Sequence, residues 1–563
     1  MLLTEVIQHS LFTLKEPIYI LFIDAKSAFD VMVPKLLLRN MFLAGMDGNT
    51  INYLNNRLQS CQTYLDWNKN IMGPILDQLG LEQGGINSGD FYKLYNNDLL
   101  LSTQKSQQGV NLGNDLVIAS IGLADDTALP ANNLSCLANI LYLVLEYCKK
   151  YDVQLCPDKT KLIRLSNNLE ETDMEMFNPI SIAGKTIDFA YVAEHVGILR
   201  SVDGNLPNIM NRISCHTSAL NAVLFAGIAR RHRANPAVGL RIERIYATPV
   251  LMSGLAALVL SESEISTIDL HFKETCENLQ KLLPKTPRSV VYFLGGCLPA
   301  RAILHLRQLT IFGMVIHLAD DPLNIHARKV LSEAKPSSRS WFWQVREICL
   351  MYNLKHPLQL LEDPPAQPAY KKLIKSHVID YWEKLLRAEA SPMLSLTNFC
   401  PKFMSLQRPH PIWTTVGSNP YEVTKAIQQA RLLSGRYRTE TLASHWSNNP
   451  EGYCLAPDCS NILETVKHIL LECPAYSENR KRQKTVWQSS DDRVIDTLTS
   501  EALSGTDEYL LQFILDCSIL PNVISSTQKH SRLILDKLFY LTRTWCFSIH
   551  RSRMKMLGRW NLQ

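Results

Sequence analysis

The chain has 563 residues, of which 46% are hydrophobic and 20% charged, an ordinary composition for a folded protein of three or four domains. Its formal net charge of +5 is too small to indicate a nucleic-acid partner, so only local basic clusters can do so. We find no apolar run of membrane-span length and no signal peptide, and the 14 scattered cysteines are typical of reduced intracellular thiols.

A buried strand is predicted at residues 19–23, where five apolar or aromatic residues lead directly into Asp24. We expect Asp30, six residues later, to cap a helix that begins there rather than to bind a metal. The loop Gln83-Gly84-Gly85 precedes a predicted helix over residues 87–100, and its glycines permit close approach of the backbone to a ligand.

A second acidic feature follows at Asp125 and Asp126, between apolar runs at residues 116–122 and 127–129. Two short strands joined by a two-residue acidic turn form a tight hairpin. A carboxylate at the end of a central strand, Asp24, facing a hairpin that holds two more, predicts a site for two hard divalent cations. A solvated acidic turn is the alternative interpretation of the same residues.

The following segment alternates helix and strand. A helix is predicted over residues 133–152, with an apolar face made of Leu134, Leu137, Leu141, Leu145 and Cys148. Strands are predicted at 153–155 and 162–165, separated by a Pro-Asp turn, and a hairpin is predicted around 183–185. This mixture favours a sheet backed by helices.

From residue 205 the pattern becomes helical, with the longest stretches at 208–233 and 240–260. Residues 362–368 are rich in proline and form the best candidate linker in the chain. The segment 370–390 and the tail 505–557 are also predicted to be helical.

The spacing Cys454-x4-Cys459-x8-His468-x4-Cys473 is the second strong signal. Three thiolates and one imidazole form a closed tetrahedral zinc site, which is structural rather than hydrolytic. So small a knuckle would need the metal in order to fold. The alternative is three buried cysteines and a core histidine.

Three basic clusters suit phosphate contacts, although any one of them alone is usually a solvated surface. They are Arg230-Arg231-His232-Arg233, then Arg431 and Arg436-Tyr437-Arg438, and finally Arg480-Lys481-Arg482 with Lys484.

The order of these motifs resembles the palm of reverse transcriptases, most closely those of non-LTR (LINE-type) retrotransposons. The motifs are the acidic strand end at Asp24, the Gln-Gly-Gly loop, the Ala-Asp-Asp hairpin and the turn Pro157-Asp158-Lys159. The resemblance is clear over residues 15–200 and looser to the C-terminus. The Cys-His spacing matches the zinc knuckle of many such elements.

The resemblance implies an α+β fold, in which a polymerase palm with a mixed or antiparallel sheet precedes a mostly helical thumb and C-terminal region with a small zinc knuckle. The implied domains are a palm at 1–200, a helical thumb at 201–330, a helical connection at 331–440, the knuckle at 441–480 and a helical tail at 481–563. A strand at 195–199 is expected to grip the primer.

The resemblance also implies the catalytic residues. Asp24 and Asp125 would bind two Mg²⁺ ions and Asp126 would support the second, with a backbone carbonyl of Ile23 or Ala25 completing the coordination. Lys159 would approach the leaving pyrophosphate and supply a charge or a proton, the alternative being a solvated lysine.

Other residues would contact the nucleotide and the template. Phe29 would lie beneath the incoming sugar and favour deoxynucleotides, the alternative being a core phenylalanine that opens a helix. Gln83, Gly84 and Ser88 would contact the nascent pair or the template. The chain departs from the family pattern at Glu82, at Gly89-Asp90 and at Leu123, positions that concern template and primer positioning rather than the metal ligands.

The implied activity is RNA-directed DNA synthesis with an RNA template, a DNA primer and deoxynucleoside triphosphates, two catalytic Mg²⁺ ions and one structural Zn²⁺. We expect an intracellular, nuclear protein with no membrane partner. Only 23 residues precede Asp24, so a fragment without fingers or endonuclease is expected. The alternatives are a catalytically inactive nucleic-acid-binding remnant, another metal-dependent phosphotransferase or nuclease, and a group II intron maturase.

Overall fold

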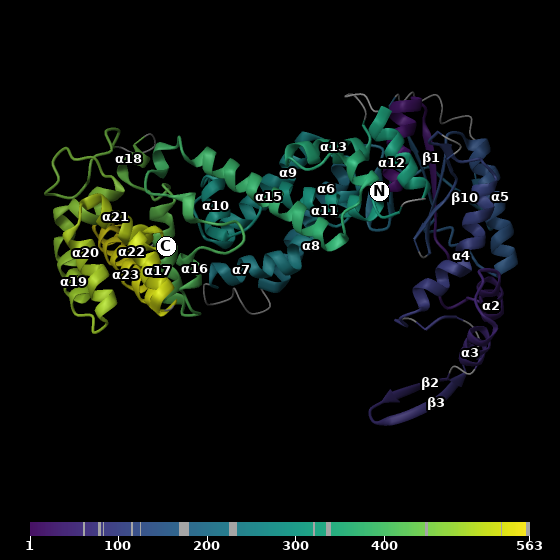
Figure 1. Ribbon diagram of the computed structural model, residues 1–563, viewed down its shortest axis with the longest axis horizontal. Coiled ribbons are helices and arrows are strands. Elements are labelled where there is room, and N and C mark those ends of the chain that lie inside the picture. Colours follow the sequence, from purple (N-terminus) through teal and green to yellow (C-terminus); the bar gives the residue numbers. More distant parts are fainter. Residues whose placement is uncertain are drawn as a thin grey trace. The chain divides into compact units, whose positions relative to one another are not determined.

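The computed structural model describes residues 1–563 except 60–61, 77–79, 83, 114–115, 124, 168–179, 225–233, 319–320, 334–338, 445–448, 531 and 559–563. The chain forms two compact units (Figure 1). Unit 1 comprises residues 1–211, 253–261 and 307–371, and unit 2 comprises 212–252, 262–306 and 372–563. The five predicted domains stay a prediction.

Unit 1 is built around an antiparallel four-stranded sheet in the order β6-β7-β1-β8. The strands are β6 (Ile121–Leu123), β7 (Asp126–Ala131), β1 (Ile18–Ile23) and β8 (Lys161–Leu165). The central strand β1 is apolar along its whole length because both faces of the sheet are covered. The predicted combination of helices with an antiparallel sheet is confirmed.

Alternate residues of β1 enter two different cores. Leu21 and Ile23 pack with the helices α4 (Ser88–Lys105) and α5 (Leu134–Tyr151) on one face of the sheet. Ile20 and Phe22 pack on the other face with α1 (Leu2–Gln8) and β4 (Val110–Asn111). Figure 1 shows α4 and α5 lying along the same side of this sheet. The sheet is therefore held rigidly from both sides.

Helix α5 forms where the sequence predicted it, and its end signals are explicit. The Asn133 side chain caps the N-terminus by accepting a hydrogen bond from the Cys136 amide at 2.8 Å. Asp152 ends the helix in the left-handed conformation. The buried face is broader than predicted, and Leu145 is 37% exposed rather than part of it. Val144, one residue earlier, is the residue buried in the core at this turn of the helix.

Several predicted elements of unit 1 need correction. No helix begins at Asp30, because residues 26–30 form turns and α2 (Pro34–Leu43) begins at a proline. Residues 153–155 form only an isolated bridge from Leu155 to Ala25. The apolar run at 116–122 is split between β5 (Val117–Ile118), which pairs with β4, and β6.

The predicted strand at residues 195–199 is a hairpin instead. Its strands β11 (Val192–His195) and β12 (Ile198–Ser201) pair antiparallel, and Val196 and Gly197 turn the chain with positive φ. The predicted hairpin at 183–185 is confirmed as β9 (Ile180–Ile182) with β10 (Lys185–Ile187).

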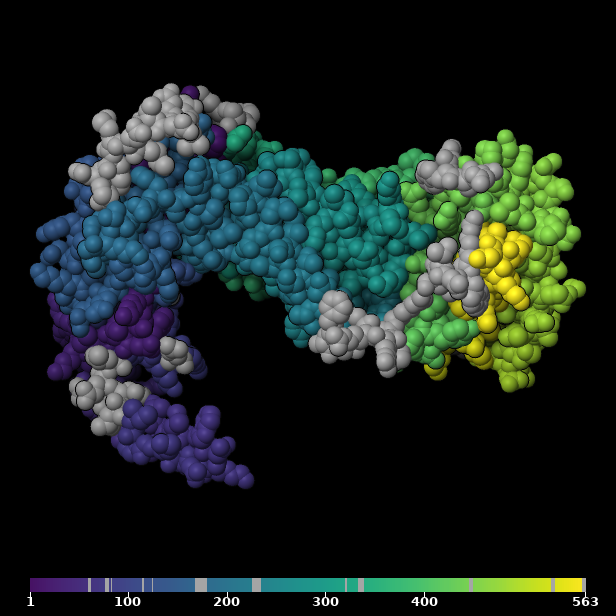
Figure 2. Space-filling view, turned by 180° about the vertical axis from the view of Figure 1, so that it is seen from behind, coloured from purple at the N-terminus to yellow at the C-terminus, as the bar shows by residue number. Residues whose placement is uncertain are grey.

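A separate hairpin of β2 (Gln62–Trp67) and β3 (Asn70–Leu76) projects from the body of unit 1 (Figures 1 and 2). Apolar side chains including Trp67, Ile71 and Met72 are exposed on it. The remaining elements of unit 1 are η1 (His9–Leu14), α3 (Gly48–Gln59), η5 (Leu255–Ala257), α12 (Pro322–Glu333), α13 (Trp341–Met351) and α14 (Pro357–Glu362). Three helices have residues in both units, namely α6 (Leu206–Val223), α11 (Ala300–Val315) and α15 (Gln367–Ala390).

Unit 2 is helical in its described part, as predicted for the second half of the chain. Its longest helix within one unit, α23 (Arg532–Met556), packs against α17 (Pro420–Leu433), α19 (Ser477–Gln488) and α21 (Asp507–Asp516). The tryptophans Trp413, Trp487 and Trp545 are fully buried in this core.

The other elements of unit 2 are mostly short. They are α7 (Pro236–Ile242), η4 (Glu243–Ala247), α8 (Thr248–Leu251), α9 (Glu262–Leu279), α10 (Arg288–Gly295), η6 (Leu394–Leu396), η7 (Pro401–Phe403), α16 (Pro411–Thr414), α18 (Glu440–Ala443), η8 (His468–Glu472), η9 (Pro474–Tyr476), α20 (Arg493–Ser504), η10 (Cys517–Ile519) and α22 (Pro521–His530). The helix predicted from Leu240 begins earlier, at Pro236, since Asn235 caps it.

One described stretch, Asp507–Thr527, is long and apolar enough to cross a membrane by length and composition, which corrects the expectation that the chain has no apolar run of that length. The bent pair of α10 and α11 meets the same test only when the two helices are counted as one span. Because 56% of the stretch 507–527 is buried inside the structure, it also has the character of a core helix, so it is weak support for a membrane span.

Candidate active site and metal-ligand cluster

The strand register brings the three predicted carboxylates to one end of the sheet. Ile23, the last residue of β1, pairs with Thr127 of β7, so Asp24 and Asp126 each lie one residue beyond this pair. Leu123 pairs with Asp126, which places Asp125 in the turn and Asp126 at the first position of β7. The predicted hairpin is thus confirmed, with its turn one residue earlier than expected.

The pKa of Asp126 shows that the negative charges of these carboxylates repel one another. Partial burial, and then the negative charges of Asp125, Asp24 and Glu194, raise the pKa of Asp126 above its ordinary value. A hydrogen bond from the backbone amide of Val196 acts in the opposite direction. A cation placed here would relieve this repulsion, which is the condition for a metal site built on oxygen ligands.

Lys159 is the counter-charge that the structure places at this site. Its Nζ atom lies 3.2 Å from Oδ2 of Asp24, and its side chain is 69% exposed compared with 21% for Asp24. The hydrogen bond and the charge of Asp24 raise the pKa of Lys159 above its ordinary value. Lys159 therefore stays protonated at neutral pH, and it suits the predicted supply of a charge better than that of a proton.

Phe29 is half-buried and stacks on Tyr92 of α4, with the ring centroids 4.6 Å apart. Tyr92 also faces Asp125, and burial, followed by that negative charge, raises its pKa well above the ordinary value. Phe29 packs against the core of unit 1, as its structural alternative expected, but it lies in a turn and opens no helix. Its role beneath a sugar stays a prediction.

The loop at residues 82–88 connects the body of unit 1 to α4. Gln83 lies outside the described residues. Gly84 is exposed and has a φ of +90°, a conformation that favours glycine. Ser88 begins α4, and its hydroxyl donates to the Glu82 carbonyl at 2.7 Å, which closes the loop. The predicted contacts of these residues with nucleotide and template stay predictions.

The four predicted zinc ligands converge in unit 2, and all four side chains are buried. Their ligand atoms all lie within 4.8 Å of one another. The Cys454–Cys473 and Cys459–Cys473 Sγ separations are 3.9 and 3.6 Å, and Cys459 Sγ lies 3.5 Å from His468 Nε2. A tetrahedral zinc ion with its usual bond lengths separates sulfur and nitrogen ligands by about 3.5–3.8 Å. The donor set and spacing therefore fit zinc.

Neighbouring groups lie beside two of these ligands. His468 Nδ1 lies 3.5 Å from Oε2 of Glu472, four residues later, without a hydrogen bond between them, at the place where a carboxylate commonly orients a metal-bound histidine. Arg480 of α19 donates to the Cys473 carbonyl at 2.7 Å. Burial raises the pKa of the Cys454 and Cys473 thiols, so the thiolates that bind metal are unfavourable without a cation.

The cluster is embedded in the helical core of unit 2. Arg553 of α23 forms a buried two-pronged ion pair with Glu464, with distances of 3.0 and 2.7 Å. Glu464 also accepts the Glu440 amide at 2.6 Å, and Trp545 donates to the Leu470 carbonyl at 3.4 Å. The expected small knuckle is therefore continuous with the surrounding helices rather than packed only on itself.

The three basic clusters fare differently. Arg230 to Arg233 lie outside the described residues. Arg431 and Arg436 donate to the backbone carbonyls of Lys281 and Lys285, and so contribute to the packing of unit 2. Tyr437 is buried and hydrogen-bonds His550, so it is part of the core of unit 2 and not of a phosphate-binding surface. Lys481, Arg482 and Lys484 remain exposed on α19.

Sequence reasoning missed the residues that surround these sites. Glu194 and the Val196 amide come from the β11–β12 hairpin, about 70 residues from Asp126, and no local pattern marks them. Glu464 and Arg553 are 89 positions apart. Glu472 alone was recognisable, because it follows His468 by four residues in a helical run.

Comparisons with known proteins agree with the motif order of unit 1. Residues 2–189 match the profile of the family described as reverse transcriptase (RNA-dependent DNA polymerase). No curated protein matches the chain.

Among solved structures, telomerase from Candida albicans, in complex with a TWJ fragment of telomeric RNA, is similar at 12% identity with a TM-score of 0.21. That match covers 62% of this chain and 54% of the telomerase chain, and so low a score does not establish a shared fold. Residues 2–189 therefore resemble an RNA-directed DNA polymerase, on the strength of the family profile.

Proposed function

We propose that this chain is an RNA-directed DNA polymerase of a non-LTR retrotransposon, acting in the nucleus on an RNA template and a DNA primer. The observation that carries the proposal is the register of β1, β7 and β6. This register brings Asp24, Asp125 and Asp126 to one end of the sheet, where these strands begin or end. This end lies within the residues that match the reverse transcriptase profile.

The proposed reaction is nucleotidyl transfer to the 3′-hydroxyl of the primer. The hydroxyl oxygen forms a bond to the α-phosphorus of the incoming triphosphate, the α–β phosphoanhydride bond breaks, and pyrophosphate leaves. The proton of the hydroxyl passes to solvent. Two bound Mg²⁺ ions would supply charge stabilisation at the attacking and leaving oxygens. The residues that would hold them are Asp24, Asp125 and Asp126, whose mutual repulsion fits a cation-binding set.

The other residues of the site would position the substrates. Lys159, beside Asp24, would contribute a positive charge toward the leaving pyrophosphate. The Phe29 ring, braced by Tyr92, would contact the sugar, and the loop of Gln83 and Gly84 would approach the base pair. In unit 2, Cys454, Cys459, His468 and Cys473 would hold one structural Zn²⁺.

Primer extension on an RNA template tests the proposal directly. The full chain is incubated with a DNA primer annealed to RNA, deoxynucleotides and Mg²⁺, and with either wild-type protein or Asp125→Asn. Extension by the wild type that is lost in the variant supports the proposal. Extension that is equal in both proteins would show that these carboxylates are not the catalytic centre.

A catalytically inactive nucleic-acid-binding remnant is the second candidate. The observation in its favour is Glu82, whose exposed carboxylate stands beside the loop expected to meet nucleic acid and lies 3.5 Å from Arg57. A negative charge there opposes the approach of a template phosphate to the carboxylates of unit 1, but it does not affect nucleic-acid binding elsewhere on the chain. RNA binding without any extension, even with manganese in place of magnesium, would favour this candidate.

A further inference from the structure

A small pocket in unit 2 is lined by three cations and by no acidic residue. It has a volume of about 240 Å³ and lies between the segment that joins α9 to α10 and the segment that joins α17 to α18. The cations are Lys285, Arg436 and Arg438, and the other lining residues, among them Leu283 and Leu442, are apolar. The charge of this lining predicts that its ligand is an anion.

These three cations have no carboxylate partner among the described residues. Lys285 and Arg438 are exposed, and neither side chain forms a hydrogen bond or an ion pair within the part of the chain that the structure describes. Arg436 is half-buried, and its Nε and Nη2 atoms donate to the Lys285 carbonyl at 3.1 and 2.9 Å. A backbone carbonyl has no formal charge, so the positive charge of the pocket remains available to a ligand.

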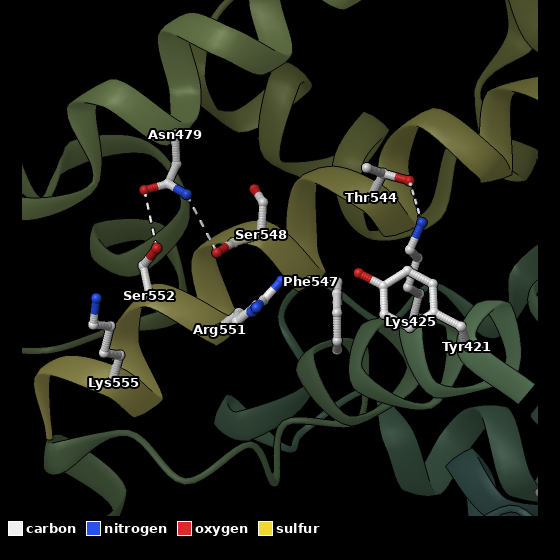
Figure 3. Close-up of a pocket in the computed structure, with 9 residues that line it drawn as sticks. All are labelled: Tyr421, Lys425, Asn479, Thr544, Phe547, Ser548, Arg551, Ser552 and Lys555. Carbon is white, nitrogen blue, oxygen red and sulfur yellow. Dashed lines mark hydrogen bonds between the residues drawn. The ribbon is translucent and has the colours of Figure 1, made fainter. Parts of the chain in front are cut away.

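A larger pocket of about 620 Å³ between α17, α19 and α23 also has basic residues in its lining, but these already interact with their neighbours (Figure 3). Lys425 binds Glu422 at 2.7 Å and Thr544 at 3.3 Å, and Glu422 also pairs with Arg543. Arg551 has a partner of its own. The charge of that larger lining therefore does not indicate a ligand, whereas the charge of the smaller pocket does.

The two walls of the small pocket are fixed to each other and to the core of unit 2. The paired hydrogen bonds of Arg436 join its own segment to the segment of Lys285. Tyr437, between the two arginines, is buried and hydrogen-bonds His550 at 2.7 Å. The backbone that carries Arg436 and Arg438 is thus anchored on both sides of the pocket, and the cations start from fixed positions.

Helix α18, which supplies Leu442 to the lining, is held by the segment that carries the Cys-His cluster. The Thr441 hydroxyl donates to the carbonyls of Gly452 and Glu464 at 3.1 and 3.0 Å. Gly452 precedes Cys454 by two residues, and a side chain at this position would collide with the backbone of Thr441. The cluster therefore supports one wall of the pocket.

The size and the mixed lining of the pocket suit a segment of a sugar-phosphate chain. Ammonium and guanidinium groups bind phosphate oxygens through charge-assisted hydrogen bonds. The apolar residues would contribute nothing to a free phosphate ion, whereas they can bury the carbon atoms of an attached sugar. Pockets for whole small molecules usually measure about 300–1,000 Å³, so the volume here favours one part of a longer ligand.

We propose that this pocket binds the sugar-phosphate backbone of single-stranded RNA, with Lys285, Arg436 and Arg438 contacting phosphate oxygens. Contacts of this kind position a nucleic acid without reading its bases, so binding should be independent of sequence. The choice of RNA among phosphate-bearing ligands rests on the proposed function.

The test compares the wild-type chain with the double variant Lys285→Gln/Arg438→Gln, which keeps Arg436 because that residue joins the walls. Binding of a fluorescent single-stranded RNA of about 20 nucleotides is measured by anisotropy over a series of salt concentrations. Each phosphate contact contributes about 0.7 to the slope of log K against log salt for a single strand, so the slope should fall by about 1.4. At about 0.1 M salt the affinity should fall on the order of tenfold.

The matched control is Lys375→Gln/Lys384→Gln, which removes the same charge from two exposed lysines of α15 in unit 2, outside the pocket. Its slope should equal that of the wild type. Slopes and affinities that are equal in the two double variants would overturn the proposal. Displacement of the RNA by inorganic phosphate or a deoxynucleoside triphosphate at equal phosphate concentration would assign the pocket to a small anion and overturn it as well.

The single variant Arg438→Gln keeps the test decisive if the double variant melts at a lower temperature. The Arg438 side chain makes no contact that the described part of unit 2 needs for folding, so this variant should melt like the wild type. Its slope should fall by about 0.7, for one lost phosphate contact. An unchanged slope in this variant would contradict the proposal.

The binding measurement needs no DNA synthesis, and this separates the proposal from the proposed function. A lower slope in the double variant, in a chain whose wild type shows no primer extension, would support the pocket and contradict the polymerase. Extension that is lost in Asp125→Asn, together with equal slopes in the double variant and its control, would support the polymerase and contradict the pocket.

Discussion

The carboxylates of unit 1 and the Cys-His cluster of unit 2 are both candidate metal sites, but they differ in burial and in the type of ligand atom. Asp24, Asp125 and Asp126 lie on strand ends and a turn, are partly exposed, and repel one another. The three cysteines and His468 are buried at separations that match a tetrahedral ion. One site is open and oxygen-based, and the other is closed and sulfur-based.

The difference shows what each site does for the molecule. A closed set of four protein ligands leaves no position for a substrate, so its metal can only stabilise the fold. An open set of carboxylates leaves positions for phosphate oxygens, so its metals can take part in chemistry. Substitutions in the closed site should therefore change the stability of the protein, and substitutions in the open site should change its activity.

The largest expected effect is at the open site. Asp125→Asn should reduce Mg²⁺-dependent primer extension on the order of a thousandfold or more, because a metal-binding carboxylate stabilises charge worth several kcal/mol in the transition state. RNA affinity, measured by anisotropy, should change less than about threefold, since phosphate contacts elsewhere supply it.

Glu146→Gln is the control for this experiment, because Glu146 is an exposed carboxylate on α5 of unit 1 to which no part of the proposed site is assigned. Its extension rate should equal that of the wild type. An equal loss in both variants would show a general charge effect rather than loss of a metal ligand.

The next effect concerns the closed site. Cys459→Ser should lower the zinc content from one ion per chain to none and destabilise unit 2 by more than about 3 kcal/mol, because metal binding and folding are coupled at such sites. Elemental analysis and thermal unfolding measure the two quantities. Cys400→Ser, a partly buried cysteine outside the cluster, should retain its zinc.

Hydrogen exchange extends the comparison to the surroundings of the cluster. Removing zinc with a chelator should expose amides of α19 and α23 as well as those of the cluster, because Arg480 and Arg553 join these helices to it. The amides of β1 and β7 should remain protected. Exchange confined to residues 450–478 would show an independent knuckle after all.

Local patterns allowed the sequence to predict much of both sites. The apolar run before Asp24, the acidic hairpin, the capped helix α5 and the Cys-His spacing each depend on neighbouring residues, and each is found in the structure. The continuous apolar run of β1 also predicts that both faces of the sheet are covered at this strand, as the structure shows.

What the sequence could not predict depends on contacts between distant residues. The amide of Val196 reaches Asp126 only because the run at 195–199 bends into a hairpin. The burial of Tyr437 follows from its packing against His550, 113 positions away. A run of basic and aromatic residues has the same composition whether it is a surface or part of a core, and only the tertiary fold decides between the two.

The ion pair between Glu464 and Arg553 gives a smaller effect than loss of the metal. Glu464→Gln leaves the buried guanidinium of Arg553 with only the more distant Glu440 carboxylate, at 3.9 Å, and removing the main partner of such a pair costs about 3 kcal/mol. Denaturant unfolding of unit 2 measures the change, and zinc stoichiometry should stay at one. Glu478→Gln, on an exposed pair with Lys481, should change stability by less than about 0.5 kcal/mol.

The smallest expected effect concerns the repulsion among the carboxylates of the open site. Burial and the charges of Asp125, Asp24 and Glu194 raise the pKa of Asp126, so the native state binds a proton at a higher pH than the unfolded chain. The resulting stabilisation is complete below the unfolded pKa and is lost as the pH rises through the folded pKa. At neutral pH, Asp126→Asn should therefore stabilise unit 1, by about 0.5 kcal/mol or less after solvent screening.

Hydrogen exchange of the β1 and β7 amides at pH 7.5 and near pH 4 measures this difference. The advantage of Asp126→Asn should shrink at the lower pH, because the wild type then carries the proton itself. Added Mg²⁺ should remove the advantage at pH 7.5, since cation binding offsets the repulsion only where all three carboxylates are present. A stability gap that is independent of both pH and Mg²⁺ would mean that the carboxylates of the open site do not act as one set.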